Sequence, residues 1–154
     1  MSLEKIKIKK LNDNATIPTR SHSTDAGLDL YASRDVIVTT GTLVPTDIAV
    51  DIPPGYEGQI RPRSGKTSNT KLRVQIGTVD SGYTGELKVI TDVTDSIELD
   101  EGSGAITKIA LRVQKGEKIA QLVISPIETP LVEVVDEFES ESERGENGFG
   151  STGK

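Results

Sequence analysis

The sequence predicts an all-β domain, either a sandwich or a barrel. Apolar and polar residues alternate with period two in many short segments, and glycine, proline, aspartate and asparagine separate those segments. Helical periodicity is thin, and we expect at most one short helix, at 64–70, with a serine as its cap. The 154 residues suit one domain that buries its own core. Because cysteine is absent, neither a disulfide framework nor a thiolate zinc site is possible.

The expected strands follow one another along the chain. Residues 5–9 alternate lysine and isoleucine, so one face of this strand is buried and the other is wet. Turn-forming residues such as Gly41, Pro54 and Gly116 separate the later strands. The stretch 91–105 is polar, acidic and glycine-rich, and we expect a loop or a loosely formed hairpin there. The remaining strands are expected at 35–39, 46–52, 58–61, 72–76, 86–91, 106–113, 118–124 and 131–135.

The chain changes character after Val135. Residues 136–154 hold six carboxylates against two cations, a net of −4, which leaves only −2 of the total charge of −6 for the rest. Residues 136–143 carry charge without apolar periodicity, as flexible linkers do. Residues 144–154, with four glycines and one apolar side chain, are either disordered without function or a flap that orders on a ligand. We therefore expect a β-barrel domain over 1–135, followed by a linker and C-terminal lid over 136–154.

Composition argues against several classes of function. The sequence lacks the basic stripe of a protein that holds long nucleic acid, and it has too few aromatic residues for a base-stacking platform. It also lacks the apolar run of a signal peptide or a membrane span, so we expect a cytoplasmic protein without membrane contact. His22 is the only histidine, and no partner for it is suggested by the sequence, so we assign it no catalytic role. A small anion remains compatible with the acidic total, because arginines and backbone N–H groups can bind it locally.

The C-terminal segment contains side chains and backbone groups that can bind a phosphate and a base. Arg144 can bind phosphate bidentately, glycines such as Gly150 let backbone N–H groups approach an anion, and Ser151 and Thr152 add hydroxyl donors. Phe149 offers a flat face that can cover a base. Residues 148–154 match the pattern G-x-x-x-x-G-K, but a P-loop needs a preceding strand, a following Ser or Thr and a helix N-terminus. We therefore reject a self-contained ATP site.

Two central segments could also bind a nucleotide. Residues 61–67 (RPRSGKT) follow a strand and can open a short helix whose N–H groups favour phosphate, although a basic surface turn explains them equally well. In residues 77–86, Ser81 and Gly82 can form a tight hairpin turn flanked by Asp80 and Tyr83. A carboxylate there could take a proton from water, although an ordinary hairpin is the more frequent meaning of such spacing.

Two further segments are ambiguous by themselves. Asp25 and Asp29 lie four residues apart, and oxygen ligands suit Mg²⁺, but a loop aspartate leading into a strand is the commoner interpretation. Gln121 is the polar residue of the strand-like run 118–124, so it either faces solvent or donates to a ligand.

Together and in this order, the five segments resemble the five motifs of the homotrimeric dUTPase family. They are residues 25–29 (DAGLD), 62–65 (PRSG), 77–85 (GTVDSGYTG), 116–121 (GEKIAQ) and 144–153 (RGENGFGSTG). The resemblance runs from about Lys5 to the C-terminus. It implies a jelly-roll-like distorted β-barrel and a homotrimer with three active sites at subunit interfaces, each closed by a tail. The implied reaction is hydrolysis of dUTP to dUMP and pyrophosphate with Mg²⁺ across the phosphates, which limits uracil incorporation into DNA and supplies dUMP.

The resemblance also implies roles for individual residues. Asp80 matches the aspartate that activates water for attack on the α-phosphate, and Tyr83 matches the tyrosine that packs under deoxyribose and leaves no room for a 2′-hydroxyl. Asp29 matches the carboxylate that holds waters of the Mg²⁺ shell. Phe149 matches the ring that stacks on uracil. The other substrate-binding residues implied are Arg63, Ser64, Gly65, Gly77, Gln121, Arg144, Gly150, Ser151 and Thr152.

The sequence departs from the family pattern in two places. Val74 stands six residues before Asp80, where many members carry an asparagine that helps to read uracil, with Gln75 beside it. Base recognition would then depend mainly on backbone groups of the hairpin. The acidic stretch 92–105 is longer than in compact members, and the sequence assigns it no role.

Three other functions are compatible with the same barrel. A dCTP deaminase-like enzyme shares the fold, but the Asp80 and Tyr83 hairpin and the complete tail argue against it. The remaining two are a binding or regulatory protein and a structural β-domain such as a virion component. A regulatory protein partner also remains compatible with the sequence.

Overall fold

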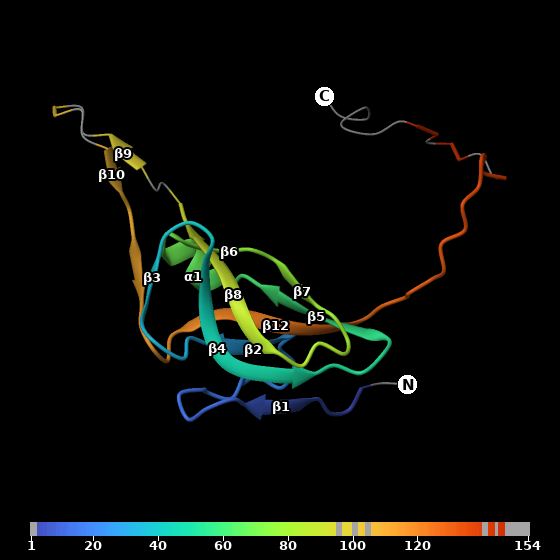
Figure 1. Ribbon diagram of the computed structural model, residues 1–154, viewed down its shortest axis with the longest axis horizontal. Coiled ribbons are helices and arrows are strands. Elements are labelled where there is room, and N and C mark those ends of the chain that lie inside the picture. Colours follow the sequence, from blue (N-terminus) through green and yellow to red (C-terminus); the bar gives the residue numbers. More distant parts are fainter. Residues whose placement is uncertain are drawn as a thin grey trace.

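The regular secondary structure of the described residues consists of β-strands and one short helix (Figure 1). The computed structural model describes residues 3–94, 97–99, 102–103, 106–139, 142–143 and 145–146. One four-stranded antiparallel sheet has the order β1-β4-β8-β6, and a second has the order β2-β12-β5-β7. Two small antiparallel pairs, β3 with β11 and β9 with β10, complete the strands, so the predicted all-β class is confirmed.

The strands of the first large sheet are β1 (Lys7–Lys10), β4 (Thr42–Asp51), β6 (Leu72–Val74) and β8 (Glu86–Val93). Those of the second are β2 (Gly27–Tyr31), β5 (Tyr56–Arg61), β7 (Gly77–Val79) and β12 (Lys118–Pro126). The small pairs are formed by β3 (Val36–Val38), β11 (Leu111–Val113), β9 (Ile97–Leu99) and β10 (Ile106–Lys108). The one helix among the described residues is α1 (Ser64–Asn69).

Burial alternates along strand β8, whereas consecutive residues are buried in β2, β4 and β12. In β8, Leu87, Val89 and Val93 are buried, whereas Lys88 and Ile90 face outward. The buried side chains of both sheets belong to one hydrophobic cluster. Each such aliphatic side chain contributes about 1.5–3 kcal/mol when it leaves water. The two sheets therefore hold each other in place, and the loops between their strands can carry the polar residues of a site.

Most predicted strands form, with different ends. The segment 46–52 is the second half of β4, which passes Pro45 through an irregularity in its register with β8. The segment 106–113 is divided into β10 and β11, which pair with different strands. A hairpin forms near the predicted segment 91–105, but only its first strand, β9, lies within that segment, and β10 begins at Ile106. Neither β2 nor β7 was expected as a strand, because their sequences are rich in turn-forming glycine and aspartate.

The predicted helix is confirmed as α1, but its expected serine cap is wrong. Ser64 is the first helical residue, and Arg63 occupies the cap position without a side-chain hydrogen bond to the helix. No helix in the described ranges is long and apolar enough to cross a membrane.

The predicted strand at 131–135 is also wrong for the single chain. The structure assigns no strand there, and Leu131, Val132 and Val134 are 98%, 90% and 91% exposed. The valine-rich composition favours a strand, but residues 127–139 run away from both sheets, so no neighbouring strand supplies hydrogen bonds to residues 131–135 (Figure 1). We call residues 127–139 the arm.

Candidate active site

The central strand β12 brings three of the predicted segments together. In the sheet register Gln121 lies opposite Asp29 of β2 on one side and Arg61 of β5 on the other. Residues opposite one another point to the same face, so these segments meet in one row across the sheet. A cavity of about 270 Å³, here called the polar pocket, opens beside them. It is lined by Ser21, Asp25, Ala26, Gly27, Asp29, Arg63, Ser64, Gly65 and Gln121.

Asp29 is the buried carboxylate of the polar pocket. Its Oδ1 lies 2.8 Å from Nε of Arg63, and its Oδ2 lies 2.9 Å from Nζ of Lys118. Asp29 belongs to strand β2, so the interpretation as a loop residue is wrong. The ammonium of Lys118 also lies 5.9 Å from the ring centroid of Tyr31. Arg63 also lines the pocket, so its guanidinium can bind an anionic ligand there, beside the carboxylates of Asp25 and Asp29.

Sequence reasoning missed Lys118. It occupies the first position of a strand-like run, where a lysine ordinarily marks the solvent face. The available signal was its place within the segment 116–121, three residues before Gln121. Its partner Asp29 lies far away in the sequence and becomes its neighbour through the pairing of β12 with β2.

Gln121 holds the loop that precedes α1. Its Nε2 donates a 2.8 Å hydrogen bond to the carbonyl oxygen of Pro62. The sequence suggested that this amide faces solvent or a ligand, and the structure instead engages it with its own chain, at the edge of the polar pocket. Gly27 makes room for it, because a Cβ at that position would overlap the amide oxygen of Gln121.

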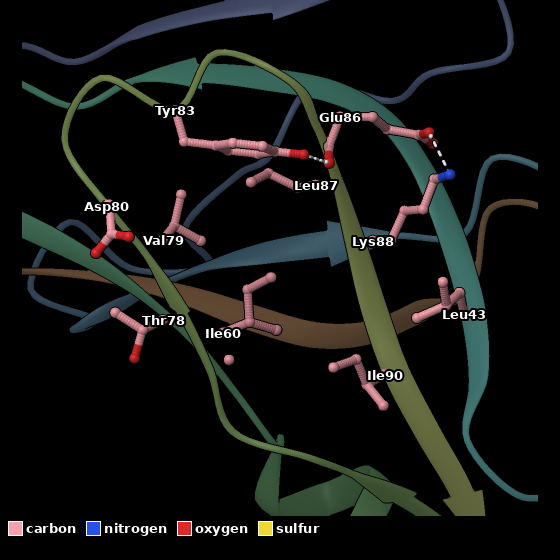
Figure 2. A pocket seen from close by; sticks show the side chains of 11 residues that line it. Leu43, Ile60, Thr78, Val79, Asp80, Tyr83, Glu86, Leu87, Lys88 and Ile90 are labelled. Carbon is pink, nitrogen blue, oxygen red and sulfur yellow. Dashed lines mark hydrogen bonds and ion pairs between the residues drawn. The ribbon is translucent and has the colours of Figure 1, made fainter.

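A second cavity, here called the apolar pocket, lies between the turn that carries Asp80 and strand β8 (Figure 2). Its volume is about 490 Å³, and its lining is largely aliphatic. The residues are Leu43, Ile60, Gly77, Thr78, Val79, Asp80, Tyr83, Glu86, Leu87, Lys88 and Ile90. Glu86 and Lys88 form an ion pair of 3.5 Å at its rim.

The turn that carries Asp80 and Tyr83 forms one end of the apolar pocket. The N–H of Tyr83 donates to the carbonyl of Asp80 at 3.2 Å, and Gly82 has a φ of 86°, which a turn of this kind requires at its third position. The tight turn is therefore confirmed, but its surroundings differ from a simple hairpin. Strand β7 pairs with β5, whereas β8 pairs with β4 and β6, so the turn connects the two large sheets.

The ring of Tyr83 extends from the turn toward the start of β8 (Figure 2). Its hydroxyl donates a 2.9 Å hydrogen bond to the carbonyl oxygen of Glu86. Gly85 permits this position, because a Cβ there would lie 2.6 Å from the tyrosine hydroxyl. Tyr83 remains 48% exposed, so one face of the ring is open to a ligand. Asp80 is exposed at the other end of the turn.

The predicted site residues thus fall into two groups within one chain. Asp29, Arg63, Ser64, Gly65 and Gln121 line the polar pocket. Gly77, Asp80 and Tyr83 line the apolar pocket, and the two linings share no residue. The tail residues Arg144, Phe149, Gly150, Ser151 and Thr152 lie outside the described residues.

The loop before β2 contains a contact that the sequence did not suggest. The backbone N–H of His22 donates to the carboxylate of Asp25 at 2.9 Å, and its Nδ1 lies 3.4 Å from the same carboxylate. His22 is a solvated loop residue, as expected, and Asp25 is a partner that the sequence did not suggest. The imidazole is 80% exposed, and Asp25 acts here as the acceptor that closes the loop beside the polar pocket.

Val74 and Gln75 are both occupied by contacts within the chain. Val74 packs against the hydrophobic cluster. The amide of Gln75 donates to the carboxylate of Asp92, which also accepts from the N–H of Gly41 at 2.7 Å. These contacts leave the base-reading role expected near this position to other groups.

Comparisons with known proteins agree with this geometry. The dUTPase family model matches residues 13–153. The deoxyuridine 5′-triphosphate nucleotidohydrolase of Clostridioides difficile is 44% identical over 153 residues, which cover 96% of this chain and 97% of that protein.

Two solved phage structures share the fold. The dUTPase of Staphylococcus bacteriophage 80alpha, solved with dUpNHpp, is 39% identical, with a TM-score of 0.85 over 99% of this chain and 100% of that one. A D95N mutant of the dUTPase from phage phi11 of S. aureus, solved to show the coordination of a structural Mg(II) ion, is 34% identical. Its TM-score is 0.75 over 89% of this chain and 100% of that one. These similarities confirm the jelly-roll-like barrel and the five-motif resemblance, and the chain therefore belongs to the dUTPase family.

Proposed function

We propose that this protein hydrolyses dUTP to dUMP and pyrophosphate, with Asp80 as the base that activates the attacking water. The observation that carries this proposal is the turn at the apolar pocket. It presents an exposed carboxylate and an open aromatic face a few residues apart. A cavity of about 490 Å³ is of the size that small ligands occupy. A carboxylate beside it can accept a proton from a water aimed at a phosphorus atom.

The two pockets suggest a division of the nucleotide. The deoxyuridine would occupy the apolar pocket, where the ring of Tyr83 leaves no room for a 2′-hydroxyl. Backbone groups near Gly77 would read uracil, since Val74 and Gln75 are engaged elsewhere. The phosphates would bind in the polar pocket, at Arg63, Ser64 and Gly65, with Gln121 fixing the loop.

The tail would complete the site. Arg144, Ser151 and Thr152 would bind phosphate, Gly150 would let the backbone approach it, and Phe149 would stack on the base. A segment that closes on the substrate excludes water from the phosphates and completes the set of catalytic contacts.

Mg²⁺ would enter with the triphosphate. Both carboxylate oxygens of Asp29 already lie in ion pairs, and 12% of its side chain is exposed, so it fits a water-mediated contact better than direct ligation. Among the described residues there is no group of three His, Cys, Asp or Glu side chains that could hold a metal ion. When bound, the ion would neutralise charge on the phosphate oxygens.

The separation of the pockets supports a homotrimer with active sites at its interfaces. The apolar pocket of one subunit would face the polar pocket of another. The exposed apolar side chains of the arm support the same assembly, since a patch of this kind marks a protein interface. We propose that the arm packs on a neighbouring subunit.

The proposed reaction would change the composition of the nucleotide pool. By removing dUTP it would limit uracil incorporation into DNA, and it would supply dUMP. A cytoplasmic location is the one we propose for this activity.

The decisive experiment measures pyrophosphate release with Mg²⁺ from dUTP, dCTP, dTTP and UTP. We expect turnover of dUTP and negligible turnover of the other three. No release from dUTP would contradict the proposed function. Equal turnover of UTP would contradict only the role of Tyr83 in excluding the 2′-hydroxyl.

A further inference from the structure

Helix α1 is too weak to hold its own position. It has six residues, fewer than the roughly 12–15 that an isolated helix needs for even marginal stability. Arg63 at its cap donates no side-chain hydrogen bond to the helix, and the first turn has no acidic residue. None of its residues is buried. Contacts from outside the helix must therefore determine where its first residues, Ser64 and Gly65, stand at the polar pocket.

Two side chains provide such contacts, one at each end of α1. At the pocket end, Nζ of Lys66 lies 2.5 Å from Oε2 of Glu117, and the two side chains are only 23% and 29% exposed. At the far end, Nη1 of Arg73 donates to the carbonyls of Thr67 at 3.1 Å and Thr70 at 2.9 Å. Arg73 lies on the strand that follows the helix, whereas Glu117 belongs to a distant part of the chain.

Glu117 is itself firmly placed. Its second carboxylate oxygen accepts from the N–H of Gln114 at 2.7 Å, and its backbone carbonyl accepts from the N–H of Ala32 at 2.9 Å. The turn it ends contains Gly116 with a φ of 85°, whose N–H donates to the carbonyl of Ala32 at 2.8 Å. Glu117 is thus a fixed point of the barrel, and Lys66 connects α1 to it.

Glu117 is also anionic at neutral pH. Burial, the largest influence, raises the pKa of Glu117. The hydrogen bonds from Lys66 and from the N–H of Gln114 more than offset it and leave the pKa below its usual value. The contact with Lys66 is therefore a partly buried ion pair, in which a lost partner leaves an unpaired charge.

The next residue binds the other end of the same segment. Lys118 pairs with Asp29, and Asp29 pairs with Arg63, at 2.9 and 2.8 Å. Residues 117 and 118 thus connect one turn of the barrel to both ends of the segment from Arg63 to Lys66. Lys66 itself points to Glu117 and does not line the polar pocket.

We propose that Lys66 and Glu117 form a positioning pair, which fixes the start of α1 so that Ser64 and Gly65 stand correctly at the polar pocket. The proposal rests on the proposed function, because it assigns these two residues to the phosphates of the substrate. It requires no contact between Lys66 and the substrate. A displaced Ser64 and Gly65 would weaken phosphate binding and leave Asp80 and Tyr83 untouched.

The test replaces Lys66 by Met, an unbranched side chain that lacks only the terminal ammonium position and carries no charge. We expect the KM for dUTP to rise by roughly tenfold and kcat to change much less, since misplacement of binding groups has effects of this order or larger. Binding of dUpNHpp should weaken by a similar factor, whereas binding of deoxyuridine, which has no phosphate, should not change. Lys7→Met is the matched control, because Lys7 pairs with Asp51 on the outer edge of the other sheet.

Charge reversal tests whether the KM depends on the ion pair itself or on either residue alone. Lys66→Glu and Glu117→Lys each place like charges together, and each should raise the KM. The double variant Lys66→Glu with Glu117→Lys restores opposite charges and should recover most of the wild-type KM. Failure of the double variant to improve on both single variants would overturn the proposed pair.

Amide exchange gives a readout that does not depend on activity. The N–H groups of Thr67 and Thr70 donate to the carbonyls of Arg63 and Lys66, so their exchange reports on α1. We expect faster exchange at both amides in Lys66→Met. If the wild type hydrolyses dUTP while Lys66→Met keeps its KM and its exchange rates, the positioning pair is wrong and the function stands. If the wild type does not hydrolyse dUTP, the proposed function is wrong. In that case, unchanged amide exchange in Lys66→Met would separately contradict the positioning pair.

Discussion

At the scale of single residues, the carboxylates of the two pockets have opposite surroundings. Asp29 is buried between two cations, so its charge is balanced and its position is fixed. Asp80 is exposed at a turn, where its carboxylate can meet water. A base must be able to accept a proton, whereas a buried, paired carboxylate holds its ion pairs by remaining charged. The two aspartates therefore suit different tasks.

We predict that Asp80→Asn abolishes nearly all turnover of dUTP. An amide cannot accept the proton of the attacking water, and loss of a general base costs about 10²–10⁴-fold in rate. Binding of dUpNHpp should remain measurable, because the amide has the size and shape of the carboxylate. Pyrophosphate release and calorimetric titration measure the two effects. An active Asp80→Asn variant would remove Asp80 from the role of base.

We predict that the backbone at Asp47 tolerates only certain residues. Asp47 has a φ of 52° within the irregular part of β4, a conformation that β-branched residues adopt at high cost. Asp47→Val should reduce the free energy of unfolding by about 1–3 kcal/mol, measured in urea, whereas Asp47→Asn should have a much smaller effect. Equal stability of the two variants would mean that the fold does not impose this backbone conformation.

Residue positions were predictable where their cause is local. Ser81 and Gly82 form their turn because of their own conformational preferences, so Asp80 and Tyr83 could be placed at its ends from sequence. The partners of Lys66 and Lys118 could not. Each lies in a different segment of the chain, and only strand register determines which cation meets which carboxylate.

At the scale of elements, strand β12 organises the polar pocket because it is central. It pairs with β2 and β5 at once, and this double register aligns Asp29, Gln121 and Arg61. The apolar pattern of residues 118–124 predicted the strand itself. The pattern could not predict its neighbours, because every half-buried strand offers the same alternation to a partner.

We predict that Gly27→Ala damages phosphate binding through Gln121. The added Cβ would overlap the amide of Gln121, which must then release the carbonyl of Pro62. Overpacking of this kind costs about 1–3 kcal/mol in stability, and the KM for dUTP should rise. Thermal unfolding and steady-state kinetics measure the two effects.

The double variant Gly27→Ala with Gln121→Ala separates these effects. It should recover only part of the stability, because the overlap with the amide is gone while Cβ of residue 121 still lies 2.9 Å from the added Cβ. It should not recover the KM, because the hydrogen bond to Pro62 is also gone. Recovery of both would mean that Gln121 does not position the loop.

At the scale of the whole molecule, the arm is the feature that a single chain cannot explain. Leu131, Val132 and Val134 are almost fully exposed, although residues 131–135 (LVEVV) have the valine-rich composition of a strand. The sequence predicted a strand at 131–135, but these residues form no strand within this chain. Its partner would have to be supplied by another subunit.

We predict that two changes beyond β12 have different effects. Replacing Leu131, Val132 and Val134 by serine should convert the proposed trimer to smaller species, measured by sedimentation equilibrium. Truncation before Arg144 should leave the protein folded and the proposed trimer intact, with severely reduced turnover. A truncated protein with full activity would contradict the lid, and a serine variant that stays trimeric would contradict the role of the arm.

We predict that the free energy of unfolding decreases as the pH falls below about 4.5. Hydrogen bonds and nearby cations lower the pKa values of Asp35, Asp47, Asp92 and Glu117 from their model-compound values of 3.8 and 4.5. A lowered folded-state pKa stabilises the fold above the unfolded-state pKa, and this stability is lost as the pH falls through the folded-state pKa. The midpoint of urea unfolding should therefore be constant near neutral pH and decrease as the pH falls below about 4.5. The decrease should be less steep in Glu117→Gln. Midpoints that rise on acidification would contradict this assignment.

The arm also sets how far the end of the chain can travel. Strand β12 ends at Pro126, and eighteen peptide units separate that residue from Arg144. A fully extended chain of this length reaches at most about 60 Å. A compact domain of this size has a radius of gyration of only about 15 Å. Distance alone therefore lets the tail serve a site on the far side of its own subunit or on a neighbour.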